Sequence, residues 1–400
     1  MLRAFDLIRK ATLGCGLALA MFGTAYAGKV NVLYPFKGGN DGAEPISGVI
    51  SDSQGNLYGT TFEGGGSGCR GQGCGTVFRL APDGTETVLY AFQGGSAGEF
   101  PVTSLVRDRD GNLYGVTARG GGPSCDEGCG TVFRLAPDGT MSVLHAFKGG
   151  SDGASPGASL LLDKHGNLYG TTAGGGSHNR GTVFRIAPDG AESVLYAFCA
   201  QANCTDGEMP WSALVADKAG NLYGTTIGGG NVCNCGVVFE LAPDGAETVL
   251  YNFCSVQPDC QDGYEPYAGV TMDKAGNLYG TTSGGGAPED GGVGTVFKLA
   301  PDGTETVLHS FSLQTDGFNP MSGVIVDKAG DIYGTLLVTH YACRETSGLV
   351  YRLSPDGSER LYCVRAGLFG GVMERNGTLY GTGNGGGKYG NGFVFAIQKH

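Results

Sequence analysis

The residues best suited to bind a ligand lie in connections that carry the motif Asp-Gly-x-x-Pro, found at 41–45, 152–156, 206–210, 262–266 and 316–320. Aromatic and acidic side chains vary from one such connection to the next, and a related connection spans 97–101. They are Glu44, Glu99, Phe100, Glu208, Trp211, Tyr264, Glu265, Tyr267 and Phe318. Aromatic rings stack on the apolar faces of sugars, while carboxylates accept their hydroxyl hydrogens. We therefore expect these residues to bind a polysaccharide or a surface protein, with ordinary loop packing as the alternative.

Two of these carboxylates also suggest an enzyme. Glu208 and Glu265, in successive connections, are candidates for the acid and base of a glycosidase or a polysaccharide lyase. However, the sequence contains no Gly-x-Ser-x-Gly elbow, phosphate-binding loop or His-Glu-x-x-His motif. No catalytic residue is assigned, and a binding protein is favoured over an enzyme. A structural envelope protein without activity is the third hypothesis.

Acidic residues at regular intervals raise the question of a metal. One acid precedes a predicted tight turn in each repeat: Asp52, Asp108, Asp163, Asp217, Asp273, Asp327 and Glu374. A ring of carboxylates could hold calcium, but Asp before a turn usually accepts local backbone hydrogen bonds. We expect no cofactor and no metal site, with calcium as the open alternative. His145 and His309 replace tyrosines of other repeats and are interpreted as packing residues. His178 and His340 lie in non-adjacent repeats, which disfavours a shared metal.

The cysteines predict disulfides. Cys15 precedes the predicted cleavage site described below, and the other cysteines form an even set. Four pairs are local: Cys69 with Cys74, Cys125 with Cys129, Cys199 with Cys204, and Cys254 with Cys260. Cys343 and Cys363 remain as a longer pair, and Cys233 and Cys235 would close a strained ring if they bond. Zinc sites are disfavoured because the pairs lack histidines at ligand spacing.

The N-terminus and the charge define the compartment and exclude some partners. Residues 1–27 have the pattern of a secretory signal peptide, with a basic start, an apolar run and Ala25-Tyr26-Ala27 at the cleavage site. The net charge of −12 disfavours nucleic-acid binding. No later segment approaches the length of a transmembrane helix. We expect a monomer that is secreted, periplasmic or extracellular.

A tandem repeat must position these residues. The motif Gly-Asn-Leu-Tyr-Gly occurs at 55–59, 111–115, 166–170, 220–224 and 276–280, with degenerate copies at 330–334 and 377–381. Each repeat has four short apolar runs, which we call A to D. In the second repeat they span 103–108, 112–117, 130–136 and 141–147, and Asp-Gly turns join A to B and C to D. Four strands per repeat indicate a propeller blade.

The two ends of the chain predict how the ring closes. Residues 29–36 match run D without a preceding A, B or C, and residues 392–397 match run C without a following D. The first strand should therefore complete the last blade. We predict an all-β, seven-bladed propeller of four-stranded antiparallel blades, forming one domain over 28–400. The turns of such a fold account for the 76 glycines.

The segments GNLYGTT, GTVFRLAPDGTETVLYAF and GGSDGASP resemble the GloVer-type extracellular tandem repeat family of bacteria. The resemblance implies a secreted or surface-attached repeat protein with no generally assigned activity. In a propeller, the B–C and D–A connections lie on one face. Here they are long and variable, whereas the A–B and C–D turns are short. We therefore expect the ligand on the B–C/D–A face.

Overall fold

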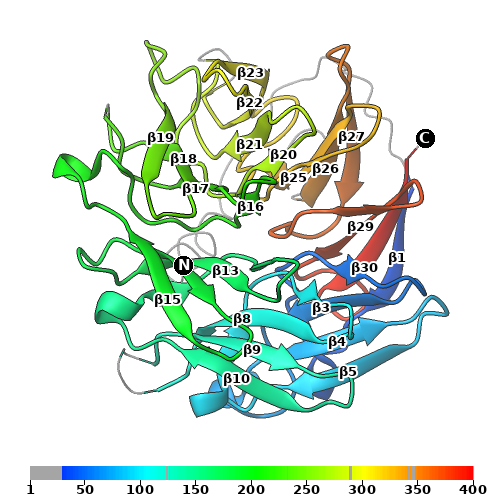
Figure 1. Cartoon of the computed structure of the whole chain (residues 1–400). Helices are drawn as coiled ribbons and strands as arrows, with labels where there is room; N and C mark the ends of the chain where they lie inside the picture. The colour runs from blue at the N-terminus through cyan, green and yellow to red at the C-terminus, as the bar shows by residue number, and fades with distance from the viewer. Residues whose placement is uncertain are drawn as a thin grey trace.

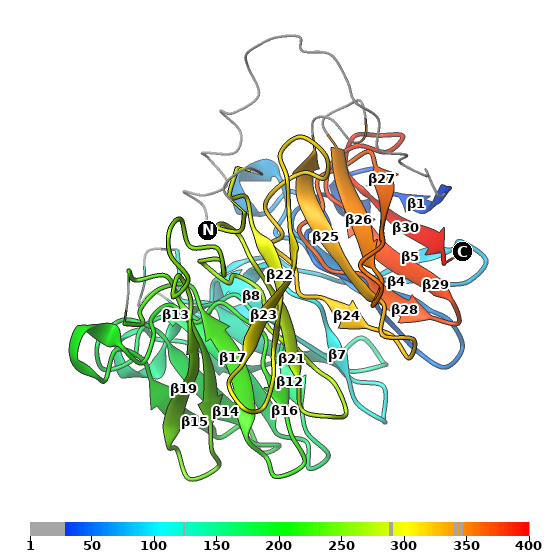
Figure 2. The same ribbon diagram turned by 90° about the horizontal axis from the view of Figure 1, so that it is seen from above.

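The computed structural model describes residues 29–399 except 123, 124, 126, 232, 288–290, 340–342 and 344–346. The predicted signal peptide, Cys15 and His340 lie outside the described residues. Seven separate antiparallel sheets follow one another along the chain and form a ring, as Figures 1 and 2 show from two directions. The predicted seven-bladed propeller is confirmed.

Each blade contributes strands A to D in chain order. The first blade has β2 (Ile50–Ser51), β3 (Leu57–Thr61), β4 (Thr76–Leu80) and β5 (Glu86–Ala91). The second has β7 (Val106–Arg107), β8 (Leu113–Arg119), β9 (Thr131–Leu135) and β10 (Met141–Ala146), and β6 (Glu99–Pro101) also pairs with β8. The third has β12 (Leu161–Leu162), β13 (Leu168–Gly174), β14 (Thr182–Ile186) and β15 (Glu192–Ala197), and β11 (Ala154–Pro156) also pairs with β13.

The remaining blades repeat this order. The fourth has β16 (Val215–Ala216), β17 (Leu222–Thr226), β18 (Val237–Leu241) and β19 (Glu247–Asn252). The fifth has β20 (Thr271–Met272), β21 (Leu278–Thr282), β22 (Thr295–Leu299) and β23 (Glu305–Ser310). The sixth has β24 (Ile325–Val326), β25 (Ile332–Thr339), β26 (Ser347–Leu353) and β27 (Glu359–Val364). Short 3₁₀ turns occur at η1 (Gly39–Asp41), η2 (Cys69–Gly71), η3 (Gly95–Ala97), η4 (Gly150–Asp152) and η5 (Ala202–Cys204).

The seventh blade joins the two ends of the chain. It consists of β28 (Met373–Arg375), β29 (Thr378–Gly383), β30 (Phe393–Gln398) and β1 (Val30–Pro35). β1 pairs with β30 from Val30 opposite Ile397 to Pro35 opposite Phe393. Figure 1 shows the blue first strand beside the red last strand. The N-terminal strand therefore completes the last blade, as its sequence predicted, and leaves no open end in the ring.

The Tyr of the Gly-Asn-Leu-Tyr-Gly motif has a local partner. In the first blade, Tyr58 Oη donates to Asp52 Oδ2 at 3.0 Å, and the Asn56 side-chain amide donates to the same oxygen at 2.7 Å. Asp52 Oδ1 accepts from the backbone amides of Gln54 and Asn56. The motif therefore closes the A–B turn with a hydrogen-bonded carboxylate.

The last Gly of the motif and the Thr that follows it connect strands and blades. A Cβ on Gly59 would lie 2.7 Å from Cζ of Phe78 on the adjacent strand, so this position requires Gly. In the fourth blade, the buried Thr225 donates to the backbone oxygen of Ala268 in the next blade at 2.9 Å. The repeated sequence is thus accounted for by the scaffold.

A chain of aromatic contacts links most neighbouring blades. The Phe that follows strand D packs edge-on against the strand C aromatic of the next blade, as for Phe198 with Phe239 at 5.0 Å between ring centroids. The same contact joins Phe36 to Phe78, Phe92 to Phe133, Phe147 to Phe184, Phe253 to Phe297 and Phe311 to Tyr351. These rings are buried and form the core between blades.

Disulfide bonds cross-link the long loops. The bonds are Cys69–Cys74, Cys125–Cys129, Cys199–Cys204, Cys233–Cys235, Cys254–Cys260 and Cys343–Cys363. The four local pairs and the longer pair are those that the spacing predicted, and Cys233 does bond to Cys235. Within the part of the chain that the structure describes, no helix is long and apolar enough to cross a membrane.

Candidate functional site

The D–A connections share one backbone conformation although their side chains differ. The residue before the Pro has a positive φ, between 52° and 59°, in all six connections that contain this Pro: Glu44, Phe100, Ser155, Met209, Glu265 and Asn319. In five of the six, all except Asn319, the amide of this residue donates to a backbone oxygen of the preceding blade, as Phe100 N does to Cys74 O at 2.9 Å. The face therefore presents variable side chains on a constant backbone.

The Pro of each connection packs against a Gly of the preceding blade. Pro210 Cδ lies so close to Gly181 that a Cβ there would approach it to 2.5 Å. Gly181 also has a φ of 97° and precedes strand C of the third blade. Because neither the Pro ring nor the Gly backbone can move aside, the two residues lock one blade to the next.

Glu99 and Phe100 lie in the most developed cluster on this face, which we call the Phe100 patch: Phe62, Glu99, Phe100, Arg119 and Glu127. The Phe62 and Phe100 rings stack with centroids 4.7 Å apart. The Arg119 guanidinium lies 5.6 Å from the Phe100 centroid and forms an ion pair with Glu127. Arg119 is directly opposite Glu99 in the pairing of β6 with β8. An aromatic surface is thus combined with charged groups.

Electrostatics distinguish the two acids of the Phe100 patch. Burial raises the pKa of Glu99; the Arg119 charge opposes this shift, and the Glu127 charge adds to it. Glu127 forms ion pairs with both Arg119 and the largely exposed Arg70. The patch therefore offers one half-buried carboxyl and one ion-paired carboxylate beside a stacked aromatic pair.

The other predicted residues lie at equivalent positions around the ring. Glu208 is 7% exposed and pairs with Arg180 at 3.1 Å. Trp211 packs on the backbone of Gly157, and Tyr264 packs on that of Gly284. Burial, and then the charge of Glu265, raise the pKa of Tyr267, so these two groups interact.

Glu44, Phe318 and the predicted pair of Glu208 with Glu265 remain to be placed. Glu44 is half-buried, and its amide donates to Asn391 O of the seventh blade. Phe318 is half-buried in the sixth connection. Among the contacts recorded for the described residues, none joins Glu208 to Glu265. The structure therefore groups Glu99 with Phe100 and Glu265 with Tyr267. Glu208 and Trp211 share the fourth connection, Tyr264 precedes Glu265 in the fifth, and Glu44 and Phe318 lie in two other connections.

The aspartates that end strand A accept hydrogen bonds from residues of their own A–B turn. Burial alone would raise the pKa of Asp217, but hydrogen bonds from Asn221 and from backbone amides outweigh it and lower the pKa. The same balance lowers the pKa of Asp52, Asp108, Asp163 and Asp273. At Asp327 burial is outweighed first by the hydrogen bond from Lys399 and then by backbone amides of the turn, which lowers the pKa of this carboxyl as well. These carboxylates have a turn-forming role, which supports the structural interpretation over a calcium ring.

The seventh blade departs from the expected acid pattern. Met373 pairs with Tyr380 as Ile50 pairs with Tyr58, so the position of Asp52 is taken by Arg375 and not by Glu374. The turn is one residue shorter and uses Asn376 and Gly377, both with positive φ. Glu374 Oε1 still accepts a hydrogen bond from Gly377 N at 2.7 Å, but Glu374 lies one position before the place of the other six acids.

A repeated cluster at the blade junctions was not identified from the sequence. The Asp of the Asp-Gly-x-x-Pro motif accepts a hydrogen bond from a strand D tyrosine, as Asp206 does from Tyr196 at 2.8 Å. The first residue of the next strand D is a glutamate, Glu247, whose pKa is raised to about 7 by burial and then by the charge of Asp206. At two junctions a histidine, His145 or His309, replaces the tyrosine and lies within hydrogen-bond distance of the Asp.

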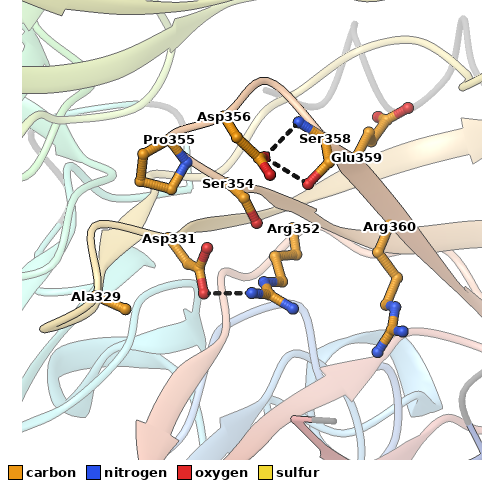
Figure 3. A pocket seen from close by; sticks show the side chains of 9 residues that line it. All are labelled: Ala329, Asp331, Arg352, Ser354, Pro355, Asp356, Ser358, Glu359 and Arg360. Atoms are coloured by element: carbon orange, nitrogen blue, oxygen red, sulfur yellow. Dashed lines mark hydrogen bonds and ion pairs between the residues drawn. The ribbon is translucent and has the colours of Figure 1, made fainter.

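A charged hollow of about 600 Å³ lies at the A–B and C–D turns of the sixth blade (Figure 3). Arg352 and Asp331 form an ion pair across it at 2.7 Å, and Asp356 accepts hydrogen bonds from Ser358. Figure 3 shows these internal contacts as dashed lines. Because the polar groups largely satisfy one another and are not on the predicted face, this hollow is a weaker candidate than the Phe100 patch. Glu359 also lies in its wall.

The chain is similar to solved structures of low sequence identity. A type-IX secretion surface component of Porphyromonas gingivalis, PorZ, is 16% identical with a TM-score of 0.52, and the match covers 91% of this chain and 47% of that one. The periplasmic gluconolactonase of Pseudomonas aeruginosa is 16% identical with a TM-score of 0.46, covering 88% and 95% of the two chains. No curated protein matches the sequence.

A family model matches nearly the whole chain. The model of the Gloeobacter/Verrucomicrobia repeat matches residues 20–233 and 216–400. These ranges include all seven blades and the Gly-Asn-Leu-Tyr-Gly motifs. The resemblance expected from the repeated segments is therefore confirmed. This chain belongs to the Gloeobacter/Verrucomicrobia repeat family.

Proposed function

We propose that the protein is a secreted propeller that binds an extracellular polysaccharide through the B–C/D–A face. The observation that carries this proposal is the constant backbone of the D–A connections, on which each blade displays different side chains. A rigid scaffold with variable loop residues is the usual arrangement of a binding surface. Residues needed only for the scaffold recur from blade to blade, whereas the residue before the Pro is Glu, Phe, Ser, Met, Glu and Asn in the six connections.

The Phe100 patch supplies the chemistry for a sugar ligand. The stacked Phe62 and Phe100 rings offer an apolar surface on which a pyranose can lie, and Arg119 and Glu127 offer a donor and an acceptor beside it. The disulfides in the B–C and D–A loops suit an oxidising compartment, where such ligands occur.

The test is a binding screen with the disulfide-bonded protein against soluble neutral and acidic polysaccharides, by affinity electrophoresis and then calorimetry. We expect Phe100→Ala and Arg119→Ala each to weaken binding at least about tenfold, which corresponds to about 1.4 kcal/mol. Arg109→Ala, in an exposed A–B turn of the same blade, is the matched control and should bind normally.

Two results would contradict the proposal. One is the absence of binding to every polysaccharide tested, with the protein shown to be folded by circular dichroism. The other is binding that Arg109→Ala weakens as much as Arg119→Ala does. Capture of a protein ligand, with no glycan bound, would replace the polysaccharide by a surface protein as the partner of this face.

A further inference from the structure

The blade junctions contain a cluster that the proposed function does not use. At five junctions it combines a strand D tyrosine or histidine, the Asp of the following connection and the first Glu of the next strand D. The tyrosine clusters are Tyr34–Asp41–Glu86, Tyr196–Asp206–Glu247 and Tyr251–Asp262–Glu305. The histidine clusters are His145–Asp152–Glu192 and His309–Asp316–Glu359.

The histidine clusters are compact enough to share an ion. In each of them, one donor atom from every side chain lies within 4.8 Å of the other two. His145 Nε2 and Asp152 Oδ1 are 2.9 Å apart. Two donors that bind one ion at about 2.1 Å lie about 3.0 Å apart at right angles and about 3.4 Å apart in the tetrahedral shell that Zn²⁺ prefers. The spacing of His145 and Asp152 therefore matches one edge of a coordination shell.

The second histidine cluster has similar geometry. His309 Nε2 lies 3.2 Å from Asp316 Oδ2 and 3.6 Å from Glu359 Oε1. The Asp316 side chain is 6% exposed, and Glu359 lies in the wall of the charged hollow of the sixth blade. An ion could therefore reach this cluster from solvent through that hollow.

The glutamates of the first histidine cluster and of all three tyrosine clusters have a buried oxygen without a hydrogen-bond partner, so this feature belongs to the blade junction, and only the histidine junctions add a nitrogen donor beside it. Glu192 Oε1 is inaccessible to solvent and has no hydrogen-bond partner. Asp152 offers Glu192 no hydrogen, because its Oδ2 accepts from Lys148 N at 2.6 Å and its Oδ1 faces the His145 ring. An ion held by His145 Nε2 and Asp152 Oδ1 would replace the hydrogen bond between these two atoms. A buried carboxylate oxygen without a donor requires a proton or a cation.

We propose that His145–Asp152–Glu192 and His309–Asp316–Glu359 are two equivalent sites for a divalent transition-metal ion, of which Zn²⁺ is the test case. One imidazole nitrogen and two carboxylates suit such an ion, whereas calcium takes oxygen ligands only. A phenol must lose its proton to act as a ligand, so the tyrosine clusters lack the third donor. An ion at a blade junction would bridge the second blade to the third, and the fifth to the sixth.

The tyrosine junctions provide the matched variants. His145→Tyr and His309→Tyr install the residue that three other junctions already accommodate beside an Asp and a Glu. Tyr196→His reproduces the metal cluster at a junction that now lacks it. Glu192→Gln removes one ligand without changing the shape of the side chain, and serves if His145→Tyr does not fold.

The experiment measures bound Zn²⁺ per chain by equilibrium dialysis of the disulfide-bonded protein at pH 7.5 without reductant, with Ca²⁺ in a parallel arm. We expect two Zn²⁺ for the wild type, one for each single His→Tyr variant or for Glu192→Gln, none for the double His→Tyr variant, and three for Tyr196→His. Ca²⁺ should not occupy these sites. Absence of Zn²⁺ from the wild type, or two ions retained by the folded double variant, would overturn the proposal.

Discussion

The contact between the Pro of each D–A connection and the Gly of the preceding blade makes a quantitative prediction. Gly181→Ala places a Cβ 2.5 Å from Pro210 Cδ and also against the backbone oxygen of Thr172. Gly190 has a similar positive φ, 87° against 97°, but its Cβ would have a single neighbour within 4 Å, Leu144 O at 3.8 Å. The pair Gly181→Ala and Gly190→Ala therefore separates crowding from backbone conformation.

The magnitude follows from these two terms. An alanine in the left-handed region costs about 1–2 kcal/mol, and replacing Gly regains about 0.4–1 kcal/mol from the unfolded chain. Gly190→Ala should therefore lower the free energy of unfolding by about 1 kcal/mol. Overpacking adds about 1–3 kcal/mol at Gly181, where neither neighbouring group can rotate away. Gly181→Ala should lose about 2–4 kcal/mol in total.

Chemical denaturation followed by circular dichroism gives both values from the shift of the transition midpoint. We expect Gly181→Ala to unfold at clearly lower denaturant concentration than Gly190→Ala. Equal midpoints would refute the conclusion that the Pro–Gly contact locks adjacent blades, because the two variants share their backbone penalty.

Three further predictions concern other contacts. The pKa of Glu247 is raised to about 7 in the folded state, so the folded protein keeps this proton at a pH where the unfolded chain loses it. The protonated Glu247 therefore stabilises the fold fully below about pH 4.5, and this contribution is lost as the pH rises through about 7. Glu247→Gln should therefore gain thermal stability over the wild type between pH 5 and pH 8, and an unchanged difference in melting temperature would contradict this. Thr225→Val removes the buried bond to Ala268 and should lower the free energy of unfolding by about 1 kcal/mol in a denaturant titration, whereas no loss would show that the bond is neutral. Replacing both Cys343 and Cys363 by Ala opens the longest disulfide loop, with a separation of 20 residues, and should cost about 3 kcal/mol in the same titration; a change below about 1 kcal/mol would contradict the loop-entropy estimate.

The scaffold was predictable because its signals are local. Asp-Gly turns, short apolar runs and the recurrence of Gly-Asn-Leu-Tyr-Gly each depend on residues close together in the chain. The closure by β1 also followed, because its sequence matches strand D and lacks a preceding strand. The local disulfides, such as Cys69–Cys74, needed only their spacing.

What the sequence did not predict depends on contacts between blades. His145 was interpreted as packing because it replaces a strand D tyrosine, and its ring does pack on Phe147 with centroids 4.8 Å apart. Its proximity to Glu192, 47 positions away on strand D of the next blade, could not be predicted from the sequence. The positive φ of Phe100 was also missed, because a residue before Pro ordinarily prefers extended backbone. A histidine in place of the strand D tyrosine, with Asp seven positions later, is the sequence signal of the His–Asp contact at these two junctions.

The most direct test of the proposed function is hydrogen–deuterium exchange of the disulfide-bonded protein with and without the polysaccharide that binds best. Binding on the B–C/D–A face predicts slower exchange in the D–A connections at 97–101, 206–210 and 262–266, and unchanged exchange in the C–D turns at 82–85 and 137–140. Protection of those turns with unchanged D–A connections would contradict the assignment of the binding face.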